Sequence, residues 1–125
     1  MTERRRYVRV PGENQVTITL LSVPGNGSPS RKKIHGFTAD ISVCGTRLTL
    51  ATKEPLLVGS VAELEMAVKD PDAVFVHEVD VRWAAPSENG AFACATGVQF
   101  RTTRKPSPQT WVHYVENQTL GFVQE

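Results

Sequence analysis

Six short segments of the chain alternate apolar and polar residues with a period of two. In the first, at residues 15–23, Val16 and Ile18 fall on one side and Thr17 falls on the other. A period of two is typical of a β-strand with one face in water. The other segments cover about residues 34–41, 46–50, 60–68, 74–83 and 92–100. Short strands leave unpaired edges unless their sheet closes, so the pattern predicts a mainly all-β fold built on a six- or seven-stranded antiparallel β-barrel.

The second of these segments ends in a polar motif. Its alternation places Phe37, Ala39 and Ile41 on the dry face. Asp40 and Ser42 are two residues apart, so we expect both to project from the outer face. Gly45 follows, and we expect it to permit a turn with positive φ that brings backbone amides close to a ligand. The alternative interpretation is a Ser turn that simply ends a strand.

The C-terminal region changes character and predicts an α-helix. Ser107 precedes Pro108, which is the preferred order for an N-cap and a first helical position. Trp111 and Val115 follow at helical spacing, and we expect this face to pack on the barrel. Gly121 is the expected C-terminal stop.

The length of 125 residues accommodates one domain. We divide it into an N-terminal arm at 1–12, a barrel at 13–104 and the helix at 107–120. No secretory signal and no apolar stretch long enough to span a bilayer is found, so we expect a cytoplasmic protein with no membrane partner. Cys44 and Cys94 are expected to be small, half-buried core thiols in a reducing compartment.

The overall charge and the motifs exclude several functions. The chain has 14 Lys and Arg against 13 Asp and Glu, a net charge of +1, which argues against a dedicated DNA binder. It contains no phosphate-binding loop, nucleophile elbow or zinc-ligand spacing, so we expect no metal, no cofactor and no catalytic residue. His77 is in phase with Val79 and Val81, which favours a core or rim position over a catalytic one.

Arginine is concentrated at the N-terminus. Four arginines fall within the first ten residues: Arg4, Arg5, Arg6 and Arg9. The planar guanidinium group matches phosphate oxygens and purine edges in bidentate fashion and also stacks on bases. Taken alone, the cluster is equally consistent with a solvated basic tail.

Two motifs together resemble the PilZ domain family. The family pattern is RxxxR near the start, followed some thirty residues later by [D/N]xSxxG. Here Arg5-Arg6-Tyr7-Val8-Arg9 matches the first part, and Asp40-Ile41-Ser42-Val43-Cys44-Gly45 matches the second. The segments at 79–83 and 97–100 look like the late strands of the family, so the resemblance covers nearly the whole chain.

The resemblance implies a non-catalytic receptor for the bacterial second messenger cyclic di-GMP. In the family, the RxxxR arm is flexible when empty and folds over the barrel when the nucleotide binds, and a downstream partner protein reads the new surface. Motility, exopolysaccharide or biofilm formation, and virulence are the family's outputs. The residues expected to bind nucleotide are Arg4, Arg5, Arg6, Arg9, Asp40, Ser42, Gly45, Trp83 and Gly97.

Individual roles follow from the family pattern. Arg5 and Arg9 would clamp phosphates and guanine Hoogsteen edges, and Asp40 would accept from a guanine Watson–Crick edge. Ser42 would contact a phosphate or a base. An arginine at the position of Arg4 accompanies an intercalated cyclic di-GMP dimer in some members, so we expect two nucleotides per site. Trp83 has two interpretations: a rim aromatic near the ligand, or a core residue.

Three alternatives stay open at this point. The chain could be a PilZ-like adaptor that contacts proteins and binds no nucleotide. It could be a barrel that binds single-stranded nucleic acid, although its nine aromatic residues leave few stacking platforms. A hydrolase that needs no metal is the third.

Overall fold

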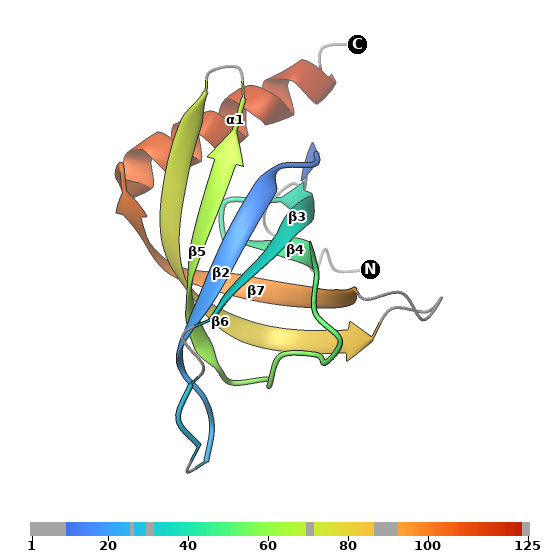
Figure 1. Cartoon of the computed structure of the whole chain (residues 1–125). Helices are drawn as coiled ribbons and strands as arrows, with labels where there is room; N and C mark the ends of the chain where they lie inside the picture. Colours follow the sequence, from blue (N-terminus) through green and yellow to red (C-terminus); the bar gives the residue numbers. More distant parts are fainter. Residues whose placement is uncertain (1–9, 26, 30–31, 70–71, 87–92, 124–125) are drawn as a thin grey trace, which may run out of the picture.

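The computed structural model describes residues 10–25, 27–29, 32–69, 72–86 and 93–123, and for 119–123 it describes the backbone alone. Seven strands precede one helix (Figure 1). They are β1 (Val10–Pro11), β2 (Gln15–Ser22), β3 (Lys33–Ile41), β4 (Gly45–Leu50), β5 (Val61–Val68), β6 (Ala73–Pro86), β7 (Cys94–Lys105) and α1 (Pro108–Val123).

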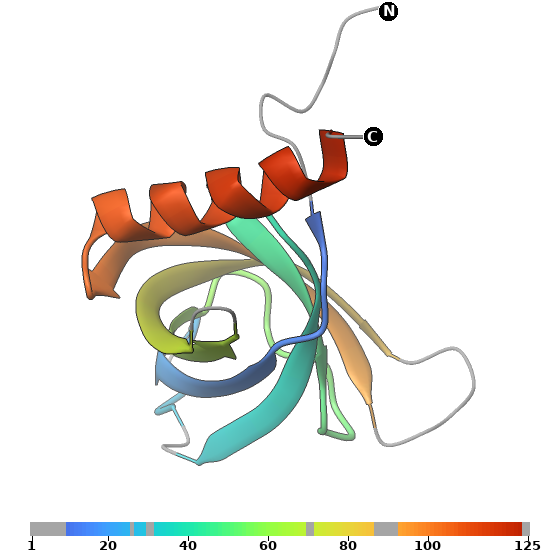
Figure 2. The same cartoon turned by 90° about the horizontal axis from the view of Figure 1, so that it is seen from above.

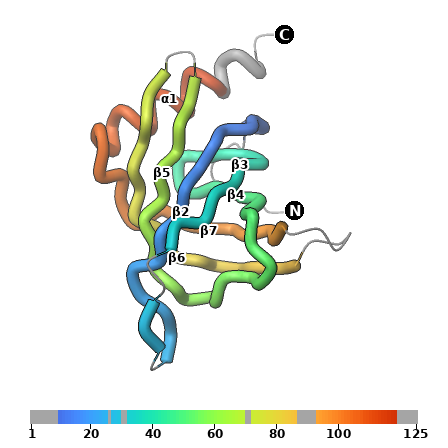
Figure 3. The backbone as a smooth tube through the Cα atoms, in the orientation of Figure 1, coloured from blue at the N-terminus to red at the C-terminus, as the bar shows by residue number. Residues whose placement is uncertain are grey.

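The strands form a closed antiparallel barrel, as the alternation predicts. The order is β1-β3-β2-β5-β6-β7-β4, and an additional pairing of β3 with β4 closes six strands into a ring. β1 is an extra short strand on β3, where Val10 lies opposite Ile41 and Pro11 opposite Asp40. The long strand β6 bends along its length (Figure 3); residues 73–80 pair with β5 and residues 76–86 pair with β7.

The inward residues of the strands form one apolar core, because each strand buries every second side chain. Ile18, Leu64 and Val79 are fully buried within it. α1 lies on the opposite side of the barrel from β2 (Figure 2) and contributes Trp111 and Val115 to the same core.

The helix begins as predicted and ends later than predicted. Ser107 is the N-cap, because its Oγ accepts a hydrogen bond from the Thr110 N–H at 3.1 Å. The predicted stop at Gly121 is wrong, since α1 continues through it to Val123. Among the described residues, α1 is the single helix, and it lacks the length and apolar character needed to cross a membrane.

The predicted orientation of β3 is wrong at Phe37, which is 44% exposed, and at Ala39, which is also exposed, whereas Ile41 is buried as predicted. The register of β3 against β4 shifts between Thr38 and Asp40, so the alternation changes phase there. The buried Thr38 hydroxyl is satisfied because it donates to the Gly12 carbonyl at 2.7 Å.

Candidate functional site

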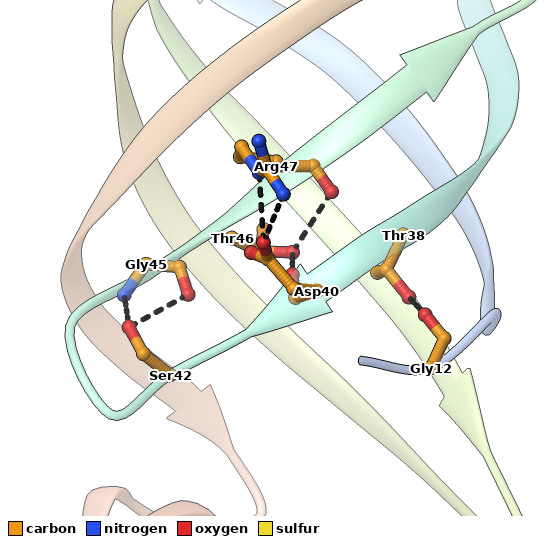
Figure 4. Close-up of polar contacts among 7 residues, drawn as sticks. All are labelled: Gly12, Thr38, Asp40, Ser42, Gly45, Thr46 and Arg47. Atoms are coloured by element: carbon orange, nitrogen blue, oxygen red, sulfur yellow. Dashed lines mark hydrogen bonds and ion pairs between the residues drawn. The ribbon is translucent and has the colours of Figure 1, made fainter. Parts of the chain in front are cut away.

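The motif that begins at Asp40 forms a closed turn between β3 and β4 (Figure 4). The Ser42 hydroxyl donates to the Gly45 carbonyl at 3.1 Å and accepts from the Gly45 N–H at 3.2 Å. The Ser42 N–H also donates to the Gly45 carbonyl, at 2.9 Å. Ser42 is only 3% exposed, so it is not on an outer face as predicted. In this structure its hydroxyl shapes the turn.

Asp40 is held by an arginine that the sequence interpretation missed. Arg47 lies opposite Asp40 in the pairing of β3 with β4. Its Nε donates to Asp40 Oδ2 at 2.7 Å and its Nη2 lies 2.6 Å from the same oxygen (Figure 4). The Asp40 side chain is 8% exposed and that of Arg47 is 50% exposed. Asp40 therefore shares its face of the sheet with the half-exposed Arg47, and the guanidinium group covers its carboxylate.

Gly45 is required for a different reason than the one predicted. Its φ is not positive, because the described glycines with positive φ are Gly25 and Gly59. A Cβ at Gly45 would instead overlap with the backbone carbonyl of Val98 on β7. Close approach of two strands therefore excludes a side chain there.

Replacing Gly45 with alanine should lower the free energy of unfolding by about 1–3 kcal/mol, because a backbone carbonyl must move to admit the new methyl group. Urea denaturation followed by circular dichroism measures this loss. Gly12→Ala is the matched control, since the nearest atom to its added Cβ is Asn14 Nδ2 at 3.8 Å. Equal losses in the two variants would show that close packing does not explain Gly45.

A hollow of about 480 Å³ opens beside this turn and collects residues from β4, β6 and β7. Three predicted site residues line it: Gly45, Trp83 and Gly97. Trp83 is 42% exposed, which decides for the rim position over the core. Its indole covers Gly97 so closely that a Cβ on Gly97 would overlap with Trp83 Nε1. A register shift between Val81 and Trp83 turns the indole outward.

Further residues line the same hollow that the sequence interpretation did not select. They are Cys44, Thr46, Arg47, Arg82, Val98 and Gln99. Arg82 directly precedes Trp83 and is exposed, so two arginines, Arg47 and Arg82, line the hollow together with the indole. Only the pairing of β7 with both β4 and β6 reveals this, because the two arginines are 35 positions apart in the sequence. The hollow offers cations and an aromatic face, which suit a phosphate and a base.

Of the two cysteines, one lies where predicted and one does not. Cys94 is 1% exposed and belongs to the core. Cys44 is exposed in the turn and lines the hollow, so its expected half-buried core position is wrong. The difference arises because the turn projects Cys44 away from the strands.

The predicted arginines Arg4, Arg5, Arg6 and Arg9 lie outside the described residues. The strand that follows them is informative, because β1 pairs with β3 at Ile41 and Asp40. Arg9 is bonded to Val10, the first residue of β1, so the arginine segment joins the barrel beside Asp40.

Two arginines near the end of β7 form ion pairs away from the hollow. Arg101 Nε donates to Asp80 Oδ1 at 3.0 Å, and this hydrogen bond raises the pKa of Arg101. Arg104 Nη2 lies 3.2 Å from Glu78 Oε1. The strand carboxylates Glu78 and Asp80 therefore form ion pairs with these arginines on an outer face of the barrel.

A family model described as the PilZ domain matches residues 3–117. The chain belongs to the PilZ domain family. PilZ domains are non-catalytic cyclic di-GMP effector domains, which confirms the prediction that the chain is not an enzyme. The predictions of the family and of a barrel with a C-terminal helix are confirmed as well.

Two solved structures share this PilZ fold. The Bacillus subtilis inhibitor of motility (MotI/DgrA) matches with a TM-score of 0.75 at 17% identity, over 98% of this chain and 55% of that one. The PilZ domain with c-di-GMP of YcgR from Escherichia coli matches with a TM-score of 0.67 at 14% identity, over 98% of this chain and 99% of that one. The chain therefore spans about half of the MotI/DgrA structure. The comparison with curated proteins gave no match.

Proposed function

We propose that this PilZ domain is a cyclic di-GMP receptor in which the arginine arm orders over the barrel when nucleotide binds. The observation that carries the proposal is the meeting of three features at one place. The Asp40 turn, the hollow under Trp83 and the attachment point of the arm are joined by the pairing of β1, β3 and β4. The YcgR domain, which has the same fold, is described with c-di-GMP.

In this proposal each residue contacts a different part of the ligand. Arg5 and Arg9 hold phosphates and guanine Hoogsteen edges, and Arg6 adds positive charge to the same arm. Asp40 accepts hydrogen bonds from a guanine Watson–Crick edge, Ser42 and Gly45 shape the turn against the ligand, and Trp83 supplies a stacking face over Gly97. Arg4 stacks on a guanine, which favours an intercalated dimer of cyclic di-GMP.

The Asp40–Arg47 ion pair suggests how the Asp40 carboxylate is held in place when no nucleotide is bound. The guanidinium group of Arg47 offsets the desolvation of a nearly buried carboxylate by pairing with it. A guanine edge would have to share or replace this partner. Half of the Arg47 side chain is exposed, so it can turn towards a phosphate without disturbing the core.

The energetics favour a switch. Ordering about ten arm residues opposes binding by about 1–2 kcal/mol each. Charge-assisted hydrogen bonds from arginine to phosphate are about twice as strong as neutral ones, so several must form together. A downstream protein would then read the ordered arm and the barrel rim in the cytoplasm, with motility or biofilm formation as the output.

Isothermal titration calorimetry with cyclic di-GMP tests the proposal, and we expect two nucleotides bound per chain. Arg5→Ala, Arg9→Ala and Asp40→Ala should each weaken binding about tenfold or more, because each removes a charge-assisted hydrogen bond of about 1.5–3 kcal/mol. Lys105→Ala is the matched control, since this exposed residue on β7 is absent from the hollow lining.

Three outcomes of that titration would contradict the proposal. No heat at high micromolar nucleotide would favour an adaptor that works through protein contacts alone. Equal affinity for short single-stranded DNA would favour a general nucleic-acid barrel. If Asp40→Ala bound like the wild type while Arg9→Ala did not, the turn would be wrongly assigned.

A further inference from the structure

The outer face of the barrel that lies away from α1 carries a groove that the nucleotide site does not use. Its central hollow has a volume of about 580 Å³. Further hollows of about 690 Å³ and 350 Å³ adjoin it at either end. The central hollow shares Phe37 and Val74 with the larger neighbour, and His35 and Ala51 with the smaller one. The three hollows therefore form one continuous outer groove.

The middle of the outer groove is apolar. Phe37 is 44% exposed and Val74 is 57% exposed, and the alanines Ala51 and Ala67 line the same hollow. These residues are outward on β3, β6 and β5 or just after β4, so they do not belong to the core. α1 packs against β7 and β1 and lies on the other side of the barrel (Figure 2). Several exposed apolar residues that adjoin in one hollow are typical of a binding surface, whereas a single one is not.

One end of the outer groove is basic. Lys32, Lys33, Lys53 and His35 line the smallest hollow together with Leu20 and Ile34. The opposite end carries Glu13, Asp72 and Lys69, so its charges nearly balance. Glu65 is the acidic residue in the middle. The charge therefore changes along the groove, from an end with both signs of charge, through an apolar centre, to a positively charged end.

We propose that the outer groove binds an extended segment of a partner protein, with an apolar anchor on Phe37 and carboxylates on the three lysines. Every strand beneath the groove is already paired on both sides, so the segment cannot add a strand and must bind through side chains. The lysine ammonium groups attract carboxylates without a fixed geometry. A concave face with one recessed aromatic ring suits a single chain segment better than a flat bilayer.

This docking surface is separate from the nucleotide site. The linings of the nucleotide hollow and of the outer groove share no residue, although β4 and β6 contribute different residues to each. The proposal therefore does not depend on nucleotide binding, and its test has its own readout. A partner on this face would leave the rim at Trp83 open.

Selection from displayed random peptides of about twelve residues tests the proposal, since such a length spans the groove in extended form. We expect enriched sequences to combine several Asp or Glu residues with one large apolar residue. Their amide shift perturbations on the labelled protein should centre on Lys33, Phe37 and Val74. Lys33→Glu and Val74→Ser should each weaken the best peptide about tenfold, and added salt should weaken it further.

Two matched variants control for general surface effects. Lys105→Glu reverses an exposed charge on β7, and Val58→Ser removes an apolar side chain that is 56% exposed, almost the same as Val74. Both should bind the peptide like the wild type. Enriched peptides without acidic residues, or equal losses in control and groove variants, would overturn the proposal. It would also fall if vesicles with anionic lipid bound and Lys33→Glu abolished that binding while no peptide was enriched.

Discussion

Replacing Trp111 with alanine should lower the free energy of unfolding by about 3–5 kcal/mol, the range for removing a buried aromatic side chain. Trp111 is 1% exposed and joins α1 to the barrel. Its ring centre lies 4.6 Å from that of His77 and 4.9 Å from that of Phe75, in edge-to-face contact with both. The substitution therefore leaves a cavity between α1 and the barrel, and the paired strands cannot move inward to fill it.

Urea denaturation followed by circular dichroism measures the loss, and Trp83→Ala is the matched control. Trp83 is 42% exposed, so its removal should cost less than about 1 kcal/mol. Each variant retains one tryptophan, so fluorescence reports separately on the helix contact and on the rim. Equal losses in the two variants would contradict the assignment of Trp111 to the core and Trp83 to the surface.

The same tryptophan reaches the candidate site. Trp111 Nε1 donates to the Val43 carbonyl at 3.2 Å, and Val43 belongs to the turn that carries Ser42. The helix thus supports the turn from behind. Trp111→Phe keeps most of the ring contacts but removes this hydrogen bond, so it separates the support of the turn from the packing of the core.

The second large effect is a loss of stability in acid that originates at His77. This side chain is fully buried, stacks on Phe100 with ring centres 4.0 Å apart, and its Nδ1 lies 2.9 Å from Thr103 Oγ1. Among the described residues, no hydrogen-bond partner faces His77 Nε2. Burial lowers the pKa of His77 from 6.5 to about 3.

The direction of the pH effect follows from these values. Between pH 6.5 and 3, His77 is protonated in the unfolded chain and neutral in the folded chain. The free energy of unfolding therefore falls as the pH falls. Above pH 6.5 both states are neutral and the contribution is complete. From pH 7.5 to pH 5 the free energy of unfolding should drop by about 2 kcal/mol, at 1.36 kcal/mol per pH unit below 6.5.

Urea denaturation at pH 7.5 and pH 5 tests this expectation, with His77→Phe as the control. Phenylalanine can keep the stack on Phe100 but cannot be protonated, so its stability should change much less over this range. The two proteins are otherwise identical, so the difference between their pH dependences isolates the effect of His77. An unchanged pH dependence in His77→Phe would assign the acid sensitivity to other groups.

The local patterns that predicted the fold are those in which sequence and packing agree. The alternation in β2 and β5 places every second residue in the core, and Ser107 caps the helix by the predicted hydrogen bond. The motif from Asp40 to Gly45 indicated the family because its residues are close together in the sequence. Alternation, capping and short motifs all depend on neighbouring residues along the chain, so they can be recognised from the sequence alone.

What the sequence could not predict depends on contacts between strands that are distant along the chain. Arg47 meets Asp40 because β3 pairs with β4, and Gly45 must be glycine because the carbonyl of Val98 approaches from β7. A register shift in β3 places Asp40 beside the half-exposed Arg47, and one in β6 turns Trp83 outward, both against the simple alternation.

By itself, then, the sequence determined a strand-rich chain, a capped helix and the residues of one motif, since period and local hydrogen bonding are properties of short segments. The tertiary structure alone decided where the alternation changes phase, in β3 and β6. It also decided which arginines line the hollow with Trp83 and where the outer groove runs. The physical reason is that a single extra residue in one strand reverses the orientation of the side chains after it, and only the closed barrel fixes where that residue lies.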